Sequence, residues 1–362
     1  MGIKHKNIYN QIFEFENLYS AYRKARKGKR GKKAVCEFEY DLEKNLFELQ
    51  NDIKNGTFRF SGYNEFIVTD PKERTISAAP FRDRVVHHAI CNFLEPILDK
   101  TLIHQTYACR YNKGSHRAIA KAVSYVRKYK YVLKLDVKKY FFSIDHEILL
   151  DKLKKKISDK KLLELIKLLL DTHDSGEEYY MGFKGDSLFE YARKKGLPIG
   201  NLTSQLFANF YLNEIDRLIC EKLKIKSFVR YMDDIIIFSD SKNELVSAFR
   251  EIENTLESFR LKLNDNKSMI INLKNGLSYL GFHIYRNRVK ILRSNLYRFI
   301  YRMKKYARFL KEGQIQLESI LMSLNAWLGF IGKDKCIGLI NNILNRIKFK
   351  QLDKGYEFTF CV

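Results

Sequence analysis

The sequence predicts an α+β fold built from several connected subdomains, and three observations support this prediction. Short stretches with strand character are scattered among longer segments of helical spacing, without the strict alternation of a parallel α/β sheet. The chain has 362 residues, more than a single small core normally contains. Hydrophobic residues make up 45% and charged residues 30%, a balance typical of folded rather than disordered chains.

The first 130 residues are predicted to form three helical segments and one hairpin. Apolar side chains recur every three to four residues in three stretches, residues 8–27, 41–55 and 82–98. Two short runs joined by a turn around residues 70–72 are predicted to be strands, residues 66–68 and 74–77.

The middle of the chain is predicted to combine strands with helices. Strand character marks residues 131–135, 228–238 and 279–285, and the second of these favours a strand, a tight turn and another strand. Helical spacing marks residues 147–170, 202–219 and 243–260. From about residue 292 onwards the sequence is helix-rich and strongly basic, which favours a separate all-helical lobe.

The charge balance is the strongest compositional signal. The formal net charge is +24, and such an excess favours a polyanionic partner, either nucleic acid or an acidic membrane surface. The sequence has no run of about 18 apolar residues that would span a bilayer. Its first residues, which include Lys4 and Lys6, resemble neither a signal peptide nor a myristoylation signal. We therefore expect a nucleic-acid partner and no membrane association.

The six cysteines are far apart and form no CxxC pair. This spacing argues against a zinc site and against a disulfide framework. Reduced thiols in a cytoplasm are the expected state.

A basic run at residues 23–33 contains Gly28 and Gly31. A solvated charged face explains most such runs, but the two glycines favour a mobile arm that contacts phosphates.

Three aspartates stand where apolar strands end. Asp136 follows the strand predicted at residues 131–135, and Asp233 and Asp234 lie at the tip of the hairpin predicted at residues 228–238. Two-metal phosphoryl transfer needs clustered carboxylates that hold ions roughly 4 Å apart, and magnesium prefers hard oxygen ligands. A bare Asp-Asp pair is usually a polar turn that caps a buried hairpin, but the additional aspartate favours a metal site.

These motifs resemble those of reverse transcriptases. The stretch Tyr231-Met232-Asp233-Asp234 is similar to the Tyr-x-Asp-Asp box of that family, and Asp136 opens a stretch similar to its first palm motif. Further stretches resemble other family motifs in the family's order: residues 71–74 with 83–84 and 94–96 (fingers), 110–116, 263–264 with Lys267 (fourth palm element) and 279–282 (primer-grip hairpin). The resemblance runs from about residue 64 to 330, and the ordered set is much more specific than any single motif.

The resemblance implies a right-hand polymerase with fingers, a palm and an all-helical thumb, the palm being an antiparallel sheet plus helices. The expected boundaries are a basic N-terminal extension at residues 1–35, fingers at 36–130, a palm at 131–284 with a helical insertion near 147–195, and a helical thumb at 285–362.

The resemblance also implies roles for individual residues. Two Mg²⁺ ions, with Mn²⁺ as an alternative, would be held by Asp136, Val137, Asp233 and Asp234. Lys267 would protonate the departing pyrophosphate. The expected nucleotide-binding residues are Lys72, Arg74, Phe141, Ile199, Gly200 and Gln205, among which the Phe141 ring would exclude a 2′-hydroxyl. The expected nucleic-acid contacts are Arg110, Tyr231, Met232, Gly281, Arg302 and Lys305.

Simpler interpretations remain open for some of these side chains. Lys72 and Arg74 are also explained as a solvated hairpin tip, and Lys267 as an exposed lysine near a turn. Phe141 is also explained as a core aromatic, which is compatible with the proposed role because a ring that excludes a hydroxyl must itself be well packed.

One departure from the usual family pattern indicates a subfamily. Most reverse transcriptases carry Gln-Gly-x-x-x-Ser-Pro before a palm helix, whereas this chain has Ile199 in place of the Gln and Gln205 in place of the Pro. This pattern is similar to that of diversity-generating retroelements, whose enzymes copy a template RNA with errors at adenines. A simple helix entry is the alternative interpretation.

The function implied by the resemblance is error-prone cDNA synthesis from a template RNA with dNTPs, as in mutagenic retrohoming. The resemblance also implies a small, basic, helical-bundle accessory variability protein, an RNA/cDNA duplex as product, and a cytoplasmic, bacterial or phage-encoded enzyme. One alternative is an antiviral-defence or retron-type reverse transcriptase. A rival of another class is a non-catalytic, RNA-binding maturase-like protein, against which the three aspartates argue.

Overall fold

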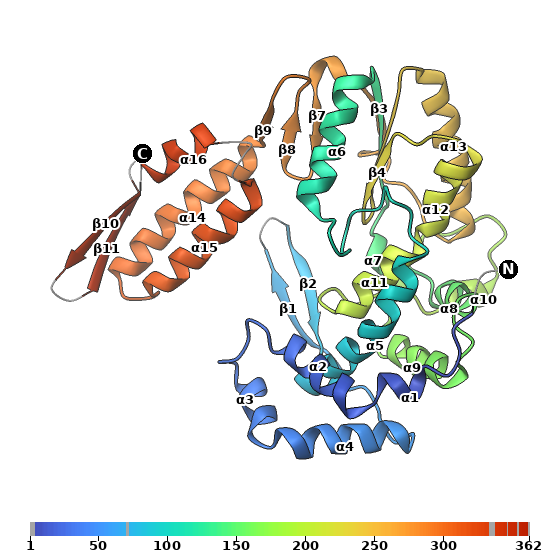
Figure 1. Cartoon of the computed structure of the whole chain (residues 1–362). Coiled ribbons are helices and arrows are strands. Elements are labelled where there is room, and N and C mark those ends of the chain that lie inside the picture. The colour runs from blue at the N-terminus through green and yellow to red at the C-terminus, as the bar shows by residue number, and fades with distance from the viewer. Residues whose placement is uncertain (1–3, 70–71, 333–336, 346, 353–354, 361–362) are drawn as a thin grey trace. The chain divides into compact units, whose positions relative to one another are not determined.

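The computed structural model describes residues 4–69, 72–332, 337–345, 347–352 and 355–360 (Figure 1). The described chain is a mixture of helices and antiparallel strands, so the α+β prediction is confirmed. It divides into two compact units. Unit 1 consists of Met1–Gly114, Leu133–Ile237 and Asn243–Met269, and unit 2 of Ser115–Val132, Phe238–Lys242 and Ile270–Val362.

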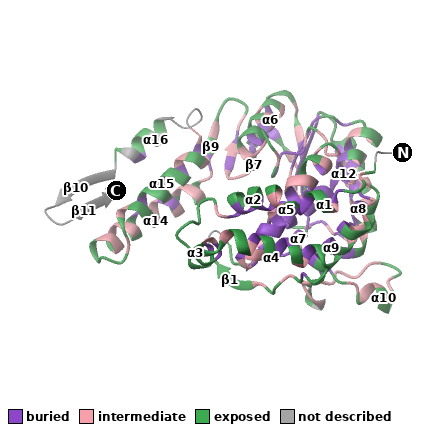
Figure 2. Ribbon diagram, turned by 60° about the horizontal axis from the view of Figure 1, so that its bottom comes forward, coloured by how far each residue is buried: buried purple, intermediate pink, exposed green. Residues whose placement is uncertain are grey.

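Unit 1 begins with short helices around one long helix. The helices are α1 (Tyr9–Ile12), α2 (Phe15–Ala25), α3 (Lys33–Tyr40), α4 (Leu42–Lys54) and α5 (Phe81–Asp99). Helix α2 packs against α5 through Leu18, Ala21, Tyr22 and Ala25, which recur at the spacing of one helical face. Figure 2 shows that much of α5 is buried.

The packing of α1 and α2 corrects one expectation. Residues 1–35 do not form a separate basic extension, because from Tyr9 to Ala25 the chain belongs to the packed body of unit 1. The basic run is likewise not a terminal arm: Lys27 to Lys32 form an exposed connection between α2 and α3. Burial of the apolar face of α2 holds this segment in the packed body, although basic residues follow it.

A two-stranded hairpin follows α4 in unit 1. Strand β1 (Asn64–Val68) pairs with β2 (Arg74–Ala78) in antiparallel register, with Val68 opposite Arg74. All residues of β1 are exposed. The backbone N–H of Ser77 donates to the carbonyl of Ile199 at 2.9 Å, which ties the base of the hairpin to the stretch before α11.

A four-stranded sheet carries the central aspartates. Its strands are β3 (Tyr131–Asp136), β4 (Phe228–Tyr231), β5 (Asp234–Ser239) and β6 (Met269–Asn272), in the order β4-β5-β3-β6. Strands β4 and β5 form the predicted hairpin, in which Tyr231 lies opposite Asp234. Apolar residues of β5, from Ile235 to Phe238, are fully or almost fully buried, which explains why this run is continuous rather than alternating.

Between residues 115 and 258, two stretches that the sequence predicted as single helices are each divided. The helices of this part of the chain are α6 (Ser115–Lys128), α7 (Tyr140–Ser143), α8 (His146–Lys154), α9 (Lys160–Asp171), α10 (Leu188–Tyr191), α11 (Leu202–Tyr211), α12 (Asn213–Arg217), a π-helix (Leu218–Lys222) and α13 (Lys242–Ser258). The stretch 147–170 is interrupted because Asp159 caps a new helix, its carboxylate accepting from the N–H of Leu162 at 3.3 Å. The stretch 202–219 is divided at Leu212.

Unit 2 contains a three-stranded meander and the C-terminal elements. The strands are β7 (Leu277–Tyr279), β8 (Phe282–Ile284) and β9 (Val289–Ile291), followed by α14 (Arg293–Lys311), α15 (Leu317–Ile331), α16 (Ile337–Leu344), β10 (Ile347–Leu352) and β11 (Gly355–Phe360). Phe299 of α14 stacks on Trp327 of α15 with ring centroids 3.8 Å apart. This aromatic contact fixes the two long helices against each other.

Two predictions for this region are wrong. Residues 279–285 are not one strand, because Leu280 and Gly281 both adopt positive φ and turn the chain back between β7 and β8. The C-terminal lobe is not all-helical, because β10 and β11 form an antiparallel hairpin. Apolar and polar residues alternate in 347–350 and 356–360, which is the strand period rather than the helical one. Within the described residues, no helix is long and apolar enough to cross a lipid bilayer.

Candidate active site

The sheet brings the three predicted aspartates to one place in unit 1. Asp136 is the last residue of β3, and Asp234 is the first residue of the neighbouring strand β5. Asp233 lies in the two-residue turn before it, next to Met232, whose φ of 55° is left-handed. The hairpin thus delivers two adjacent carboxylates beside the end of β3, as the sequence predicted.

The electrostatics of these carboxylates show that they repel one another. The pKa of Asp233 is raised from 3.8 to about 6, first by burial and next by the negative charges of Asp234 and Asp136. The pKa of Asp234 is also raised, chiefly by burial. A site that buries several carboxylates together is unfavourable by itself and becomes favourable when cations bind.

Residues 263–268 surround Asp136. Its carboxylate Oδ2 accepts from the ammonium nitrogen of Lys267 at 2.6 Å and from the amide nitrogen of Asn264 at 3.3 Å. Its backbone carbonyl accepts from the N–H of Asn264 at 2.8 Å. The main chain of Val137 forms an isolated bridge with Leu263. The predicted Lys267 is therefore in direct contact with the predicted metal ligand.

The residues fit a divalent metal, although the side chains are not arranged as a finished metal cage. Within the described residues, no three His, Cys, Asp or Glu side chains lie close enough to hold an ion as they stand. Asp136 is turned towards Lys267, whose ammonium neutralises it. Hard carboxylate oxygens are the ligands that Mg²⁺ prefers, and the neighbouring negative charges that help to raise the pKa of Asp233 would favour a bound cation.

The predicted triphosphate clamp lies at the hairpin β1–β2. Lys72 and Arg74 are both exposed. The positive charge of Lys72 lowers the pKa of Asp234 and partly opposes the effect of burial, which places this lysine within electrostatic reach of the aspartates. A cation at this position suits a triphosphate that approaches the carboxylates.

Phe141 lies on α7, five residues after Asp136. Its ring packs edge-on against Tyr140 with centroids 5.8 Å apart, and its carbonyl accepts from the N–H of Leu197 at 2.7 Å. The hydroxyl of Tyr140 donates to the carbonyl of Ala208, so α7 is anchored from both sides. The Phe141 side chain is half-buried.

The stretch around Ile199 lies beside the hairpin. The Ile199 carbonyl accepts from Ser77, and Gly200 adopts a φ of 128°. A Cβ atom at Gly200 would lie 3.1 Å from Cγ2 of Ile76, so a side chain here would be strained and crowded. The side-chain oxygen of Gln205 accepts from Sγ of Cys109 at 3.3 Å. Gln205 thus already has a partner within the protein.

Arg110 has an internal role. Its guanidinium donates to the carboxylate of Asp99 at 2.5 Å and to the carbonyls of Ile103 and Thr106 at 2.6 and 3.1 Å. Only 10% of its side chain is exposed. These contacts fix the loop after α5, and the nucleic-acid contact expected of Arg110 stays a prediction.

The remaining predicted contacts are distributed between the units. In unit 1, Tyr231 and Met232 flank the aspartates and are half-buried. In unit 2, the Gly281 carbonyl accepts from the N–H of Leu292 at 3.0 Å, and a Cβ at Gly281 would lie 2.7 Å from Cζ of Phe330. Arg302 and Lys305 lie on α14, where the Lys305 ammonium sits 5.1 Å from the Phe309 ring centroid.

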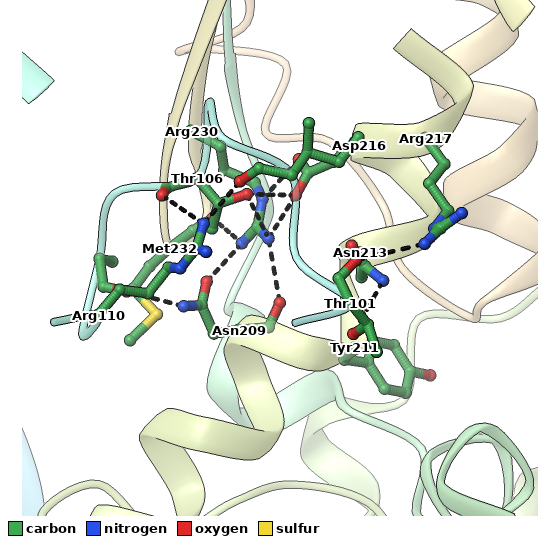
Figure 3. A network of polar contacts seen from close by, with 12 residues as sticks. Thr101, Thr106, Arg110, Asn209, Tyr211, Asn213, Asp216, Arg217, Arg230 and Met232 are labelled. Carbon is green, nitrogen blue, oxygen red and sulfur yellow. Dashed lines mark hydrogen bonds and ion pairs between the residues drawn. The ribbon is translucent and has the colours of Figure 1, made fainter. Parts of the chain in front are cut away.

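Sequence reasoning missed a buried ion pair behind the aspartates. Arg230 and Asp216 have fully buried side chains, and Nη2 of Arg230 lies 2.6 Å from Oδ2 of Asp216 (Figure 3). The available signal was Arg230 itself, because a charged residue inside the apolar strand Phe228–Tyr231 must find a partner. The identity of that partner, on α12, was not readable from the sequence.

Comparison with known proteins agrees with this geometry. The family described as reverse transcriptase (RNA-dependent DNA polymerase) matches residues 69–284, more than half of the chain. The COX1/OXI3 intron 2 protein of Saccharomyces cerevisiae is 25% identical over 377 residues, which cover 86% of this chain and 43% of that protein. The group II intron-encoded protein LtrA of Lactococcus lactis subsp. cremoris is 24% identical over 256 residues, 68% of this chain and 38% of LtrA.

A third relative has a higher sequence identity than these two, over a shorter stretch of the chain. The retron Ec73 reverse transcriptase of Escherichia coli is 33% identical over 128 residues, which cover 32% of this chain and 34% of that protein. The matched stretches span less than half the length of each of these relatives. The family match contains Asp136, Asp233 and Asp234 together with the hairpin β1–β2 from residue 69 onwards. The chain belongs to the reverse transcriptase (RNA-dependent DNA polymerase) family.

Proposed function

We propose that the protein is an RNA-directed DNA polymerase that extends a primer by two-metal-ion nucleotidyl transfer. The observation that carries this proposal is the placement of three aspartates at the ends of neighbouring strands, with the pKa of Asp233 raised by burial and by its two neighbours. A family that polymerises DNA on RNA and a half-buried set of carboxylates that favours cations support the same chemistry.

Asp136, Asp233 and Asp234, with the Val137 carbonyl, would hold two Mg²⁺ ions. Bound there, the ions would activate the primer 3′-hydroxyl and neutralise the charge that develops on the triphosphate. The 3′-hydroxyl would lose its proton to water as its oxygen forms a bond to the α-phosphorus, the bond from that phosphorus to the bridging oxygen would break, and pyrophosphate would leave. Lys267, whose ammonium contacts Asp136, would give the leaving pyrophosphate a proton.

Other side chains would orient the substrates. Lys72 and Arg74 would bind the phosphates of the incoming dNTP, where bidentate guanidinium geometry favours Arg74. Phe141 would pack against C2′ of the sugar and exclude a ribose hydroxyl. Tyr231, Met232, Gly281, Arg302 and Lys305 are proposed contacts for the primer and its RNA template.

The experiment is primer extension on an RNA of defined sequence. Wild-type protein with Mg²⁺ and dNTPs should add nucleotides in the order that the template dictates, and chelation of the metal should stop the reaction. Binding of RNA without any extension, in Mg²⁺ or Mn²⁺, would contradict the proposal and favour a non-catalytic maturase-like protein.

Within this family, we propose the diversity-generating type, which makes error-prone cDNA with the help of an accessory variability protein. Its support is the pair Ile199 and Gln205, both of which depart from the usual motif. Ile199 has no side-chain donor or acceptor, and Gln205 is engaged by Cys109. A lost neutral hydrogen bond of about 0.5–1.5 kcal/mol corresponds to an error increase of several-fold to about tenfold.

The subtype is tested by sequencing cDNA made by the wild type and by Ile199→Gln on one template RNA. The wild type should make an excess of errors at template adenines, and the substitution should lower it. The similarity to the retron Ec73 reverse transcriptase favours the second candidate, a retron or defence enzyme. A wild-type error spectrum without any adenine excess would favour that candidate.

A further inference from the structure

Arg230 is a charged residue inside the apolar hairpin that carries Asp233 and Asp234. It lies on β4, and its side chain is fully buried. A guanidinium has five N–H groups and never loses its proton in a protein, so each N–H that is buried needs an acceptor. In this protein each of the five N–H groups of Arg230 has an acceptor.

The acceptors come from three separate elements of unit 1. Nε and Nη2 of Arg230 donate to the two carboxylate oxygens of Asp216 on α12 at 2.7 and 2.6 Å. Nη1 donates to the side-chain oxygen of Asn209 on α11 at 2.9 Å, and Nη2 to its carbonyl at 3.0 Å. Asp216 also accepts from the hydroxyl of Thr106 at 2.7 Å. Two helices and one loop are thereby fixed to one guanidinium.

The remaining donor reaches the turn itself. Nη1 of Arg230 donates to the carbonyl of Met232 at 3.3 Å, and Figure 3 shows that carbonyl facing the guanidinium. Met232 adopts a left-handed φ of 55°, which is unfavourable for a residue with a long side chain. The next residue along the chain is Asp233. The direction of the Asp233 side chain therefore depends on a strained turn that Arg230 holds.

We propose that Arg230, clamped by Asp216 and Asn209, is a positioning residue that holds the Met232 turn so that Asp233 presents its carboxylate to the metals. The inference rests on the proposed polymerase function, but it concerns geometry that exists without substrate. A bidentate pair with Asp216 makes the guanidinium rigid, and the rigid guanidinium restrains the turn. A misplacement of about 1 Å in a catalytic group can lower a rate by about a hundredfold.

The rival explanation is that the buried pair only stabilises the fold. The triple variant Thr106→Val/Asp216→Leu/Arg230→Met distinguishes the two explanations, because it removes the ion pair without leaving a buried charge. Apolar replacement of a buried ion pair often leaves stability unchanged or higher. A structural role then predicts normal metal binding and turnover. A positioning role predicts that both remain impaired in a folded protein.

Arg230→Lys is the second variant, in case the triple variant does not fold. Lysine keeps the positive charge next to Asp216 but lacks the planar fork that reaches Asn209 and Met232. The matched control is Lys152→Met. Lys152 is another buried cation, 5% exposed, and donates to the Tyr211 carbonyl at the end of α11 at 3.0 Å. It touches the same helical region without contacting the turn.

The measurement has two parts, made on the full chain. Electron paramagnetic resonance gives the midpoint of Mn²⁺ binding in a complex with dNTP and an RNA template whose primer ends in a dideoxynucleotide, so that no chemistry occurs. Primer extension gives kcat and KM for dNTP. In Arg230→Lys and in the triple variant, we expect the Mn²⁺ midpoint to rise about tenfold and kcat to fall about ten- to a hundredfold, with a much smaller change in KM.

The outcomes are distinct. A folded triple variant, or Arg230→Lys, with the wild-type Mn²⁺ midpoint and kcat overturns the positioning role. The same losses in Lys152→Met would also overturn it, because any disturbance of α11 would then suffice. If the wild type binds Mn²⁺ but never extends a primer, the polymerase proposal fails, whereas the Mn²⁺ midpoints of the variants still test the role of Arg230.

Discussion

The ammonium nitrogen of Lys267 lies 2.6 Å from Oδ2 of Asp136, so a positive charge lies against one face of this carboxylate. The lysine side chain is 45% exposed and the aspartate side chain 13%. Because the ion pair is partly screened by solvent, it contributes about 1 kcal/mol or less to stability. The pair matters for the proposed reaction, because Lys267 contacts a proposed metal ligand and is itself the proposed proton donor to pyrophosphate.

Lys267 has two expected effects, competition with metal ions for Asp136 and proton donation to pyrophosphate, and substitutions should distinguish them. In Lys267→Met no ammonium competes for Asp136, so half-maximal activity should need a few-fold less Mg²⁺. At saturating Mg²⁺ the rate should nevertheless fall at least about tenfold, because a general acid typically contributes about 10²–10⁴-fold. Lys267→Arg keeps the charge but cannot donate its proton, and it should also be slow. Full activity of the arginine variant would show that Lys267 acts only as a charge.

Removal of the charge at Asp233 should stabilise the metal-free protein at neutral pH. Since the folded-state pKa is raised from 3.8 to about 6, the contribution of Asp233 to stability is complete below pH 4 and is lost as the pH rises through 6. Asp233→Asn should therefore raise the free energy of unfolding at pH 7.5 by roughly 1–3 kcal/mol, and the gain should shrink towards pH 4. Chemical denaturation in a chelator at both pH values measures this. A variant less stable than the wild type at pH 7.5 would contradict the electrostatic account.

The choice between sugars is assigned to Phe141. Phe141→Ala opens space beside C2′, so the ratio of rNTP to dNTP incorporation should rise by at least about tenfold, an energy difference of about 1.4 kcal/mol. Phe142→Ala is the control, because the neighbouring ring stacks on Tyr179 with centroids 4.6 Å apart. An unchanged ratio in an active Phe141→Ala variant would move the discriminating contact to another residue.

The basic connection between α2 and α3 should bind RNA phosphates. Neutralising Lys29, Arg30, Lys32 and Lys33 with glutamine should flatten the dependence of RNA affinity on salt by roughly two to three log–log units, since each phosphate contact on a single strand contributes about 0.7. The control replaces four exposed lysines at the end of α8 and the start of α9, namely Lys154, Lys155, Lys160 and Lys161. Equal slopes in the two variants would mean that this connection has no special role.

The sequence predicted those helices and strands whose hydrophobic pattern is visible within a short stretch of the chain. The hairpin at 228–238 and the strand ending in Asp136 were recognisable because continuous apolar runs end in acids, and the structure confirms both. The break at Asp159 was missed because the residues on both sides keep a helical apolar spacing. The sequence predicted one strand where the chain turns back at Leu280 and Gly281, because apolar residues continue through the turn.

Contacts between distant segments were beyond sequence reasoning. Nothing in the order of residues pairs Arg230 with Asp216 rather than with another acid, since the partner is selected by the packing of α11 and α12. Arg110 was expected to bind nucleic acid because residues 110–116 resemble a family motif. The sequence did not show that Asp99, at the end of α5, gives Arg110 an internal partner. The net charge of the sequence predicts the class of partner, a polyanion. The folded structure decides which basic side chains face solvent and can contact that partner.

The most direct test of the account measures polymerisation and RNA binding together in Asp233→Asn. The asparagine keeps the shape of the side chain but removes a charge from the metal site. Primer extension on RNA should fall by at least about a thousandfold, or about 4 kcal/mol, while RNA affinity stays within about twofold of the wild type. Asp151→Asn, at an exposed carboxylate on α8 that pairs with Lys154, should leave both unchanged. Extension by Asp233→Asn within a few-fold of the wild type would contradict the assignment of the catalytic carboxylates.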